Sequence, residues 1–207
     1  MELDLERVID MGDQLNERTR LAIFASGSGS NFEAIAAACQ SGEVDAEVAL
    51  MVCDKPGAGV IERANRLGIE TLVLSPKSFG SKAEYEQAIL DRLEQCQVEF
   101  ICLAGYMRIL TDVILTAYPD RILNIHPSLL PAFKGINAIP QAFNYGVKYY
   151  GATIHFVNEE LDGGAVVDQE AFRYDGRDID ELEAMVHTIE HQLYVRALRA
   201  VLIEINS

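Results

Sequence analysis

The sequence predicts an α/β fold: a mostly parallel, doubly wound sheet with helices on both faces and a long C-terminal helix. Short apolar runs alternate with helical patterns along the first half of the chain, which is typical of parallel strands joined by crossover helices. The 207 residues are 49% hydrophobic, enough to bury one sizeable core. We therefore expect a single domain at 21–207, preceded by a charged N-terminal extension at 1–20.

The elements expected in the first half follow one another in a regular order. The apolar runs with the length of buried strands lie at 21–25, 46–53, 71–74 and 100–104. The helical patterns between them lie at 31–39, 59–67 and 81–96. Continuous apolar strands of this kind are buried on both faces, so helices are expected to cover the sheet on either side.

After Thr111 the pattern changes. The strands expected there lie at 121–126, 151–157 and 166–173, and the last two are suited to antiparallel pairing. A proline-rich turn at 127–131 and a helix at 139–144 follow the first of these strands. A long closing helix is expected at 179–205, because apolar side chains recur there at helical spacing: Leu182, Met185, Val186, Ile189, Leu193, Leu198 and Val201.

Composition excludes several classes of protein. The formal net charge of -15 repels nucleic-acid backbones, so no nucleic-acid partner is expected. The cysteines form no Cys-x-x-Cys pair and have no histidine at ligand spacing, so neither a disulfide framework nor a metal site is expected: Cys39, Cys53, Cys96 and Cys102. No apolar run approaches the ~20 residues that span a bilayer, and the charged start does not resemble a secretory signal. We expect a cytoplasmic protein that does not bind a membrane.

A glycine-rich loop, Ser26-Gly27-Ser28-Gly29-Ser30-Asn31, stands between a predicted strand and a predicted helix. Glycines allow a tight turn, and the free N–H groups of the helix N-terminus can then bind an anion. Phe32 stands where the dinucleotide fingerprint requires a third glycine, so the loop suits one phosphate better than a pyrophosphate. Ser30 and Asn31 are also good helix caps, so a capped turn without a ligand explains the same residues.

Asn124-Ile125-His126 is a second candidate. The period of a strand puts Asn124 and His126 on the same face, near the carboxyl end of a strand, where open α/β sheets bind ligands. Pro127 and Pro131 stiffen the turn that follows. A histidine satisfied by ordinary hydrogen bonds beside a loop is the alternative for this residue.

Two further segments have both a functional and an ordinary interpretation. Leu161-Asp162-Gly163-Gly164 has the composition of a turn, and acquires a role only if Asp162 lies near the histidine. Gly105 to Leu110 holds Tyr106, Met107 and Arg108, which suit a pocket for a flat ligand with a carboxylate tail. The same segment is equally compatible with a plain connection from strand to helix.

Together these segments resemble the phosphoribosylglycinamide formyltransferases, folate-dependent enzymes of purine synthesis. The resemblance extends from about Leu21 to Leu198 and rests on segments in the family's order and at its separations: 25–31, 103–110, 124–131 and 161–164. It implies a Rossmann-like formyltransferase sheet. It also implies transfer of a formyl group from 10-formyltetrahydrofolate, as co-substrate, to the amine of glycinamide ribonucleotide, without a metal.

The resemblance assigns roles residue by residue. The catalytic residues are Asn124, His126 and Asp162, and the separation of 36 positions between the last two (162 minus 126) also agrees. The residues expected to bind the ribonucleotide are Gly29, Ser30, Asn31, His187 and Glu190. Those expected at the folate are Lys82, Met107, Arg108, Ile109, Leu110, Asn124, Asn158, Glu159, Glu160 and Leu161. The family mechanism is direct attack by the amine, with Asn124 and His126 stabilising the tetrahedral oxyanion and Asp162 orienting His126 and a proton-relay water.

The chain departs from the family pattern at a few positions. His187 replaces a common glutamine, Asn137 stands where many relatives have histidine, and Ala165 replaces the usual proline. None of these changes removes a catalytic group. The resemblance leaves open whether the protein is a monomer or a homodimer, since relatives include both.

Two other functions remain open at this point. A formyltetrahydrofolate hydrolase uses the same catalytic residues on water, and the stretch 146–153 looks hydrolase-like. Hydrolases generally carry an N-terminal regulatory domain, which 1–20 is too short to form, and a second histidine where Pro127 stands. A non-catalytic nucleotide-binding module is the other alternative, with Asp54 as the acid that holds a ribose.

Overall fold

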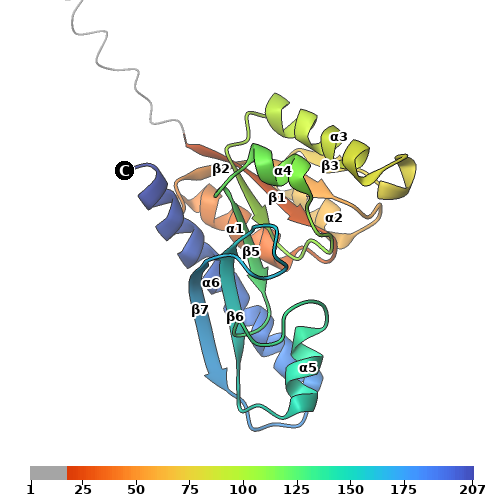
Figure 1. Ribbon diagram of the computed structural model, residues 1–207. Coiled ribbons are helices and arrows are strands. Elements are labelled where there is room, and N and C mark those ends of the chain that lie inside the picture. The colour runs from red at the N-terminus through yellow and green to blue at the C-terminus, as the bar shows by residue number, and fades with distance from the viewer. Residues whose placement is uncertain (1–17) are drawn as a thin grey trace, which may run out of the picture.

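The computed structural model describes residues 18–207, in which seven strands form one sheet (Figure 1). The predicted extension lies outside the described residues up to residue 17. The strands are β1 (Thr19–Ala25), β2 (Ala46–Cys53), β3 (Thr71–Val73), β4 (Phe100–Leu103), β5 (Ile122–His126), β6 (Tyr149–Phe156) and β7 (Val166–Arg173). The helices are α1 (Ser30–Ser41), α2 (Gly59–Arg66), α3 (Lys82–Gln95), α4 (Asp112–Ala117), α5 (Ala138–Tyr145) and α6 (Ile179–Ile205), with a 3-10 turn η2 (Pro76–Ser78).

The predicted elements are confirmed with boundaries within two residues, and β2, β7 and α6 agree in full. Two short elements, α4 and η2, were not predicted from the sequence. The α4 helix is a single short stretch with one fully buried apolar side chain, Ile114. Such a stretch is too short to show a helical period, which explains why it was missed.

The strand order β3-β2-β1-β4-β5-β6-β7 makes the sheet doubly wound. Strands β1 to β5 are parallel to their neighbours, whereas β6 pairs antiparallel with both β5 and β7. The predicted antiparallel pairing at the end of the chain is therefore confirmed. The chain moves outward from β1 to β3 and then returns to β4 beside β1, so the strand order reverses between β1 and β4. Open α/β sheets bind their ligands at such a switch point.

Both faces of the sheet are buried, as the continuous apolar strands predict. In β1, Leu21 and Ile23 belong to the core cluster shared with α1 and α6, whereas Ala22 and Phe24 belong to the cluster shared with α3 and α4. A third, smaller cluster joins α5, β6, β7 and the beginning of α6. In Figure 1 this cluster lies in the lower part of the molecule, and α6 runs from there to the upper part.

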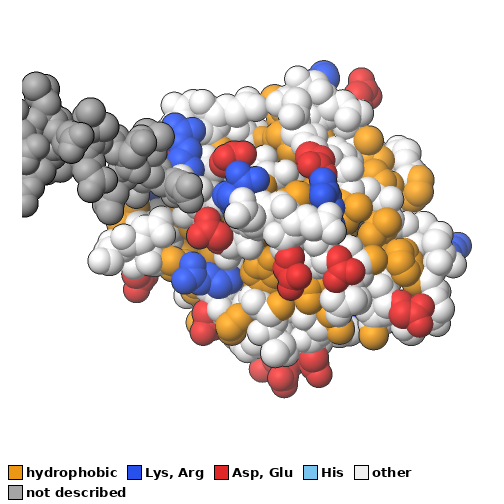
Figure 2. Space-filling view, turned by 90° about the horizontal axis from the view of Figure 1, so that it is seen from above, with side chains coloured by type: hydrophobic (Ala, Val, Ile, Leu, Met, Phe, Trp, Pro, Cys, Tyr) orange, Lys and Arg blue, Asp and Glu red, His pale blue; other side chains and the backbone are white. Residues whose placement is uncertain are grey.

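The surface mixes charges of both signs with apolar side chains. Figure 2 views the side on which α3 and α4 lie and shows acidic and basic side chains interspersed there. Within 18–207, none of the helices combines the length and apolar character needed to cross a bilayer. Over the same residues, no group of three or more His, Cys, Asp or Glu side chains is arranged to hold a metal ion.

Tyr194 of α6 joins the closing helix to the sheet. Its side chain is fully buried, and its hydroxyl lies 3.2 Å from the carbonyl oxygen of Leu103 in β4 and 3.0 Å from that of Leu123 in β5. Tyr194→Phe is therefore expected to lower the free energy of unfolding by about 1–3 kcal/mol, because the substitution removes the single hydroxyl proton that the two buried carbonyls share. Urea denaturation would measure the loss. Tyr145→Phe, at a tyrosine that is 79% exposed, is the control, and equal losses in both variants would contradict the role of the Tyr194 hydroxyl.

Candidate active site

The glycine-rich loop follows β1 and leads into α1. Gly29 is the N-cap residue of α1, and its backbone is left-handed (φ 80°). A Cβ on Gly29 would lie 2.6 Å from Cβ of Val60, so this position requires glycine. Ser30 and Asn31 lie inside α1, and the helix start has no side-chain cap. The alternative of a turn capped by Ser30 or Asn31 is therefore wrong. The first N–H groups of α1 are left available for an anion.

Contacts from α2 hold this loop. The backbone N–H of Val60 donates to the carbonyl of Gly27 at 3.1 Å. The guanidinium of Arg63 donates through Nε to the carbonyl of Ser28 at 2.8 Å. Both contacts orient carbonyl groups away from the helix start, so the loop presents its N–H side there, where an anion is favoured.

Asn31 connects the loop to the closing helix. Its amide Nδ2 donates to Oε2 of Glu190 at 3.0 Å, and Nδ1 of His187 lies 2.9 Å from the same oxygen. The Glu190 side chain is buried, whereas 53% of the His187 side chain is exposed. The hydrogen bond with Glu190 raises the pKa of His187, against the smaller opposing effect of burial. The structure thus brings together all five residues expected at the ribonucleotide.

Asn124 and His126 lie at the carboxyl end of β5 on one face of the strand, as expected. Asp162 comes from the connection between β6 and β7, where its backbone is left-handed (φ 49°). Its Oδ2 lies 3.4 Å from Nδ1 of His126 and accepts a 2.7 Å hydrogen bond from the N–H of Gly135. On the other side of the ring, Nε2 of His126 lies 2.8 Å from the carbonyl oxygen of Phe133. The three predicted catalytic residues therefore meet, and both ring nitrogens of His126 face acceptors.

His155 of β6 is a site residue that the sequence analysis missed. It stands directly across from Asn124 in the antiparallel register, and its Nε2 lies 3.1 Å from Nδ2 of Asn124 and 3.7 Å from Oδ1 of Asp162. Burial lowers the pKa of His155, which favours the neutral ring. Its Nδ1 donates to the carbonyl of Phe156 at 2.8 Å, so Nε2 accepts from the Asn124 amide. The alternating direction of side chains along a strand predicts which residues of β6 share a face with His155. Only the register between β5 and β6 shows that His155 lies opposite Asn124.

The segment 105–110 lies next to the glycine loop. The N–H of Ser26 donates to the carbonyl of Gly105 at 3.1 Å, and its hydroxyl accepts from the N–H of Met107 at 2.9 Å. Met107 and Ile109 are 70% and 61% exposed, whereas Leu110 is buried. Two apolar side chains that remain exposed in one short segment indicate a surface for an apolar ligand.

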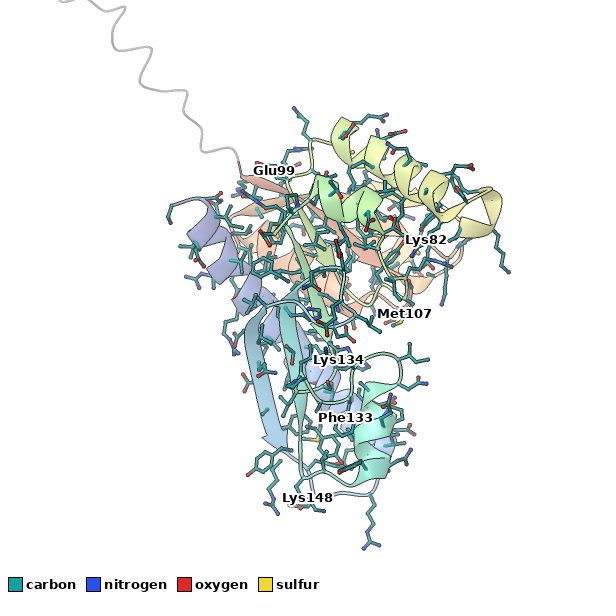
Figure 3. All side chains as sticks on the ribbon, viewed as in Figure 1. Lys82, Glu99, Met107, Phe133, Lys134 and Lys148 are labelled. Atoms are coloured by element: carbon teal, nitrogen blue, oxygen red, sulfur yellow. The ribbon has the colours of Figure 1, made fainter. Side chains whose placement is uncertain are left out.

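The other residues expected at the folate line two separate cavities. Lys82 and Arg108 line a cavity of about 290 Å³ with Phe79, Tyr85 and Glu86. Asn158, Glu159 and Glu160 line another, of about 480 Å³, between the β6–β7 connection and α4. Leu161 is half-exposed. One segment of the chain, 105–112, contributes to both cavities: Arg108 lines the smaller one and Asp112 lines the larger one. In the view of Figure 3, Lys82 and Met107 lie above the loop that carries Phe133 and Lys134.

Comparison with known proteins decides the family. Residues 19–198 match the sequence profile of the formyl transferase family. This chain belongs to that family. The phosphoribosylglycinamide formyltransferase of Bacillus subtilis (strain 168) is 48% identical over 184 residues, which are 88% of this chain and 94% of the relative. The crystal structure of glycinamide ribonucleotide transformylase 1 from Geobacillus kaustophilus is 49% identical with a TM-score of 0.87, and the match covers 89% of this chain and 99% of that one.

The relative of the same name from Haemophilus influenzae is 40% identical over 84% of this chain and 83% of its own length. The resemblance inferred from the four sequence segments is therefore confirmed, and the chain is an enzyme of the formyltransferase class. The alternative of a non-catalytic nucleotide-binding module depended on Asp54. Only 1% of that side chain is exposed and its Oδ2 is paired with Arg108 at 2.7 Å, so it is not at the surface where a ribose would bind.

Gly29→Ala is expected to lower the free energy of unfolding by about 1–3 kcal/mol, because the added Cβ meets Val60 and the backbone is left-handed. Urea denaturation at equilibrium would measure the difference. Gly27→Ala is the matched control in the same loop, since a Cβ there meets nothing within 4 Å. A loss of similar size in the control would show that the Val60 contact is not the cause.

The pH dependence of stability is expected to report the His187–Glu190 contact. The raised pKa means that this contact stabilises the folded state below the usual histidine pKa of 6.5, and that the stabilisation is lost as the pH rises through the raised value. The unfolding free energy of wild type should therefore exceed that of His187→Gln by more at about pH 5.5 than at about pH 8.5. The change in this advantage between the two pH values should be less than about 1 kcal/mol, because the His187 side chain is half-exposed.

Urea titrations at the two pH values would measure this difference. His191→Gln is the control of opposite sign, because burial lowers the pKa of His191 and its neutral form is the stable one in the fold. The advantage of wild type over His191→Gln should grow as the pH rises. A His187 difference that does not change with pH would contradict the assigned contact.

Proposed function

We propose that this enzyme transfers the formyl group of 10-formyltetrahydrofolate to the amine of glycinamide ribonucleotide, as a cytoplasmic step of purine biosynthesis. The observation that carries the proposal is the meeting of Asn124, His126 and Asp162 at the carboxyl end of β5. This group lies at the sheet edge that also holds an anion-binding loop and an exposed apolar segment. The names of the relatives support the same substrates.

The reaction begins when the free amine of the ribonucleotide attacks the formyl carbon. A new C–N bond forms, and the carbonyl electron pair moves to oxygen to give a tetrahedral oxyanion. One N–H of the Asn124 amide donates to His155, so the other N–H remains to donate to this oxygen. Collapse of the intermediate breaks the bond to the folate nitrogen, which leaves with a proton.

His126 supplies the second donor. Its two nitrogens face the carbonyl of Phe133 and the carboxylate of Asp162, and a ring with a proton on each nitrogen satisfies both acceptors. The developing oxyanion is a stronger acceptor than a backbone carbonyl, so it replaces Phe133 as the partner of Nε2. Asp162 orients the ring from the Nδ1 side and holds the water that relays the proton from the amine to the leaving nitrogen.

The two substrates approach this centre from different sides. The N–H groups of Gly29, Ser30 and Asn31 bind the phosphate of the ribonucleotide, and Glu190 accepts hydrogen bonds from its ribose hydroxyls. The folate ring packs on 107–110 and on the backbone of 158–161, and its carboxylates meet Lys82 and Arg108. In a protein of net charge -15, these local donors overcome the unfavourable field that anionic substrates meet.

One assay distinguishes transfer from hydrolysis. The purified protein is mixed with the dideaza analogue of 10-formyltetrahydrofolate, with and without glycinamide ribonucleotide, and deformylation is followed by absorbance. Release that requires the ribonucleotide supports the transferase. Release at the same rate without it would replace the proposal by a formyltetrahydrofolate hydrolase.

Asp162→Asn is expected to preserve the fold and to reduce kcat by roughly 10²–10⁴-fold, because the amide no longer accepts from both His126 and the relay water as the carboxylate does. The same absorbance assay measures kcat, and thermal unfolding checks the fold. Asp175→Asn, at an aspartate paired with Arg173 on the surface, is the matched control and should keep full activity. Near-normal turnover in Asp162→Asn would contradict the role assigned to Asp162.

A further inference from the structure

A half-buried ion pair outside the catalytic centre includes one residue, Asp54, that has no role in the mechanism above. It joins Asp54, which follows β2, to Arg108 in the segment after β4, with 2.7 Å between Oδ2 and Nε. Only 1% of the Asp54 side chain is exposed, whereas 40% of the Arg108 side chain is. The pair therefore has one end fixed inside the protein and one end open to solvent.

Stability is a weak explanation for this pair. The second carboxylate oxygen of Asp54, Oδ1, is buried and has no hydrogen-bond partner among the described residues. A buried carboxylate with a single partner loses much of its solvation, and the attraction between the two charges often fails to offset that loss. A buried charge of this kind is explained better by the geometry that it imposes on its partner.

The fold shows what that geometry is. Strands β2 and β4 flank β1, so the Asp54–Arg108 pair bridges the carboxyl end of β1. Ser26, at that same end, holds the backbone of Gly105 and Met107. The segment is thus fixed by its backbone at Ser26 and by the Arg108 side chain at Asp54.

Tyr106, between these two points, is held as well. Its ring packs edge-on against Phe24 with 5.2 Å between the ring centres, and its hydroxyl lies 2.8 Å from that of Tyr85. Because the neighbouring backbone and side chains are fixed, the bond to Asp54 determines the direction of the Arg108 guanidinium. Its two terminal nitrogens carry the N–H donors that remain for another partner.

That partner is suggested by the cavity of about 290 Å³ that Arg108 lines. Lys82, the first residue of α3, adds a second positive charge, and Phe79 and Tyr85 add aromatic surface. The carboxylate of Glu86, also in the lining, already accepts hydrogen bonds from the N–H and the hydroxyl of Thr111. The two cations are therefore the groups left to meet a ligand, and they suit a carboxylate attached to an aromatic group.

We propose that Asp54 is a positioning residue for the formyl donor: it holds Arg108 so that the guanidinium meets a carboxylate in the tail of the folate. The inference rests on the proposed function for the identity of the ligand. It assigns to Asp54 an effect on the binding of the tail, with no contact to the reacting atoms. Removal of the Asp54 charge should therefore change the KM for the donor and leave kcat nearly unchanged.

The test compares Asp54→Asn with wild type on two donors: the dideaza formyl donor with its glutamate tail, and the same donor cut back to its aromatic ring. The KM for the tailed donor should rise about tenfold, while the KM for the truncated donor, the KM for the ribonucleotide and kcat stay within about twofold. An unchanged KM for the tailed donor would overturn the inference. So would an equal rise for both donors, since that is the result of a general structural defect.

A double-mutant cycle tests whether Asp54 acts through Arg108. In an Arg108→Ala background, Asp54→Asn should add less than about twofold to the KM for the tailed donor. A further tenfold rise there would show that Asp54 acts by another route. Arg108→Lys keeps the positive charge but lacks the planar fork, so it should raise this KM as Asp54→Asn does. Wild-type behaviour of Arg108→Lys would contradict the inference even if Asp54→Asn failed to fold.

Asp168→Asn is the matched control, because Asp168 of β7 also pairs with an arginine Nε at 2.7 Å, that of Arg196. It should leave all of these constants unchanged. Equilibrium binding of the two deformylated dideaza folates, measured by calorimetry, separates this inference from the proposed function. If wild type transferred no formyl group, the proposed function would fail, while a loss of affinity in Asp54→Asn for the tailed folate alone would still support the positioning role.

Discussion

The reversal of strand order between β1 and β4 is the constraint on which the site depends. Parallel strands end at the same edge of a sheet, and the reversal leaves a crevice there because the connections on either side diverge. The glycine loop and the segment 105–110 follow strands that end at this edge, and Asn124 and His126 belong to the end of β5 itself. Ser26 bonds the first two segments directly. The glycine loop and the exposed apolar segment are therefore parts of one structural unit.

The antiparallel strand β6 completes what the parallel sheet begins. After a connection that contains α5, β6 pairs antiparallel with β5 and places His155 opposite Asn124. The connection from β6 to β7 then brings Asp162 to His126. Two histidines thus contact one aspartate in different environments: His155 is buried with its tautomer determined by the Phe156 carbonyl, and His126 faces an acceptor at each nitrogen. His155 contacts the Asn124 amide, whereas His126 lies beside Asp162.

Individual hydrogen-bond donors near the candidate site are held by polar partners, in a protein whose overall charge is strongly negative. A net charge of -15 disfavours the approach of anions, and several donors near the candidate site are held in place by other polar groups. Arg63 donates to the Ser28 carbonyl and braces the glycine loop. Arg108 is held by Asp54, and Asn31 is held by Glu190. In each case a polar partner restricts one donor or one segment, which lowers the entropy lost when a ligand binds.

The sequence by itself determined the class of fold, nearly every strand and helix, and the family to which the candidate site segments point. These features depend on local signals: the period of apolar residues, glycine and proline in turns, and motifs of a few residues. It also indicated that Asn124 and His126 share a face, because strand geometry is local. Only the tertiary structure decided that His155 stands across from Asn124, that Asp54 holds Arg108, and that the expected folate residues line two cavities. Each of these contacts joins segments far apart in the chain, and which segments meet depends on strand order and register, to which no single stretch of sequence is specific.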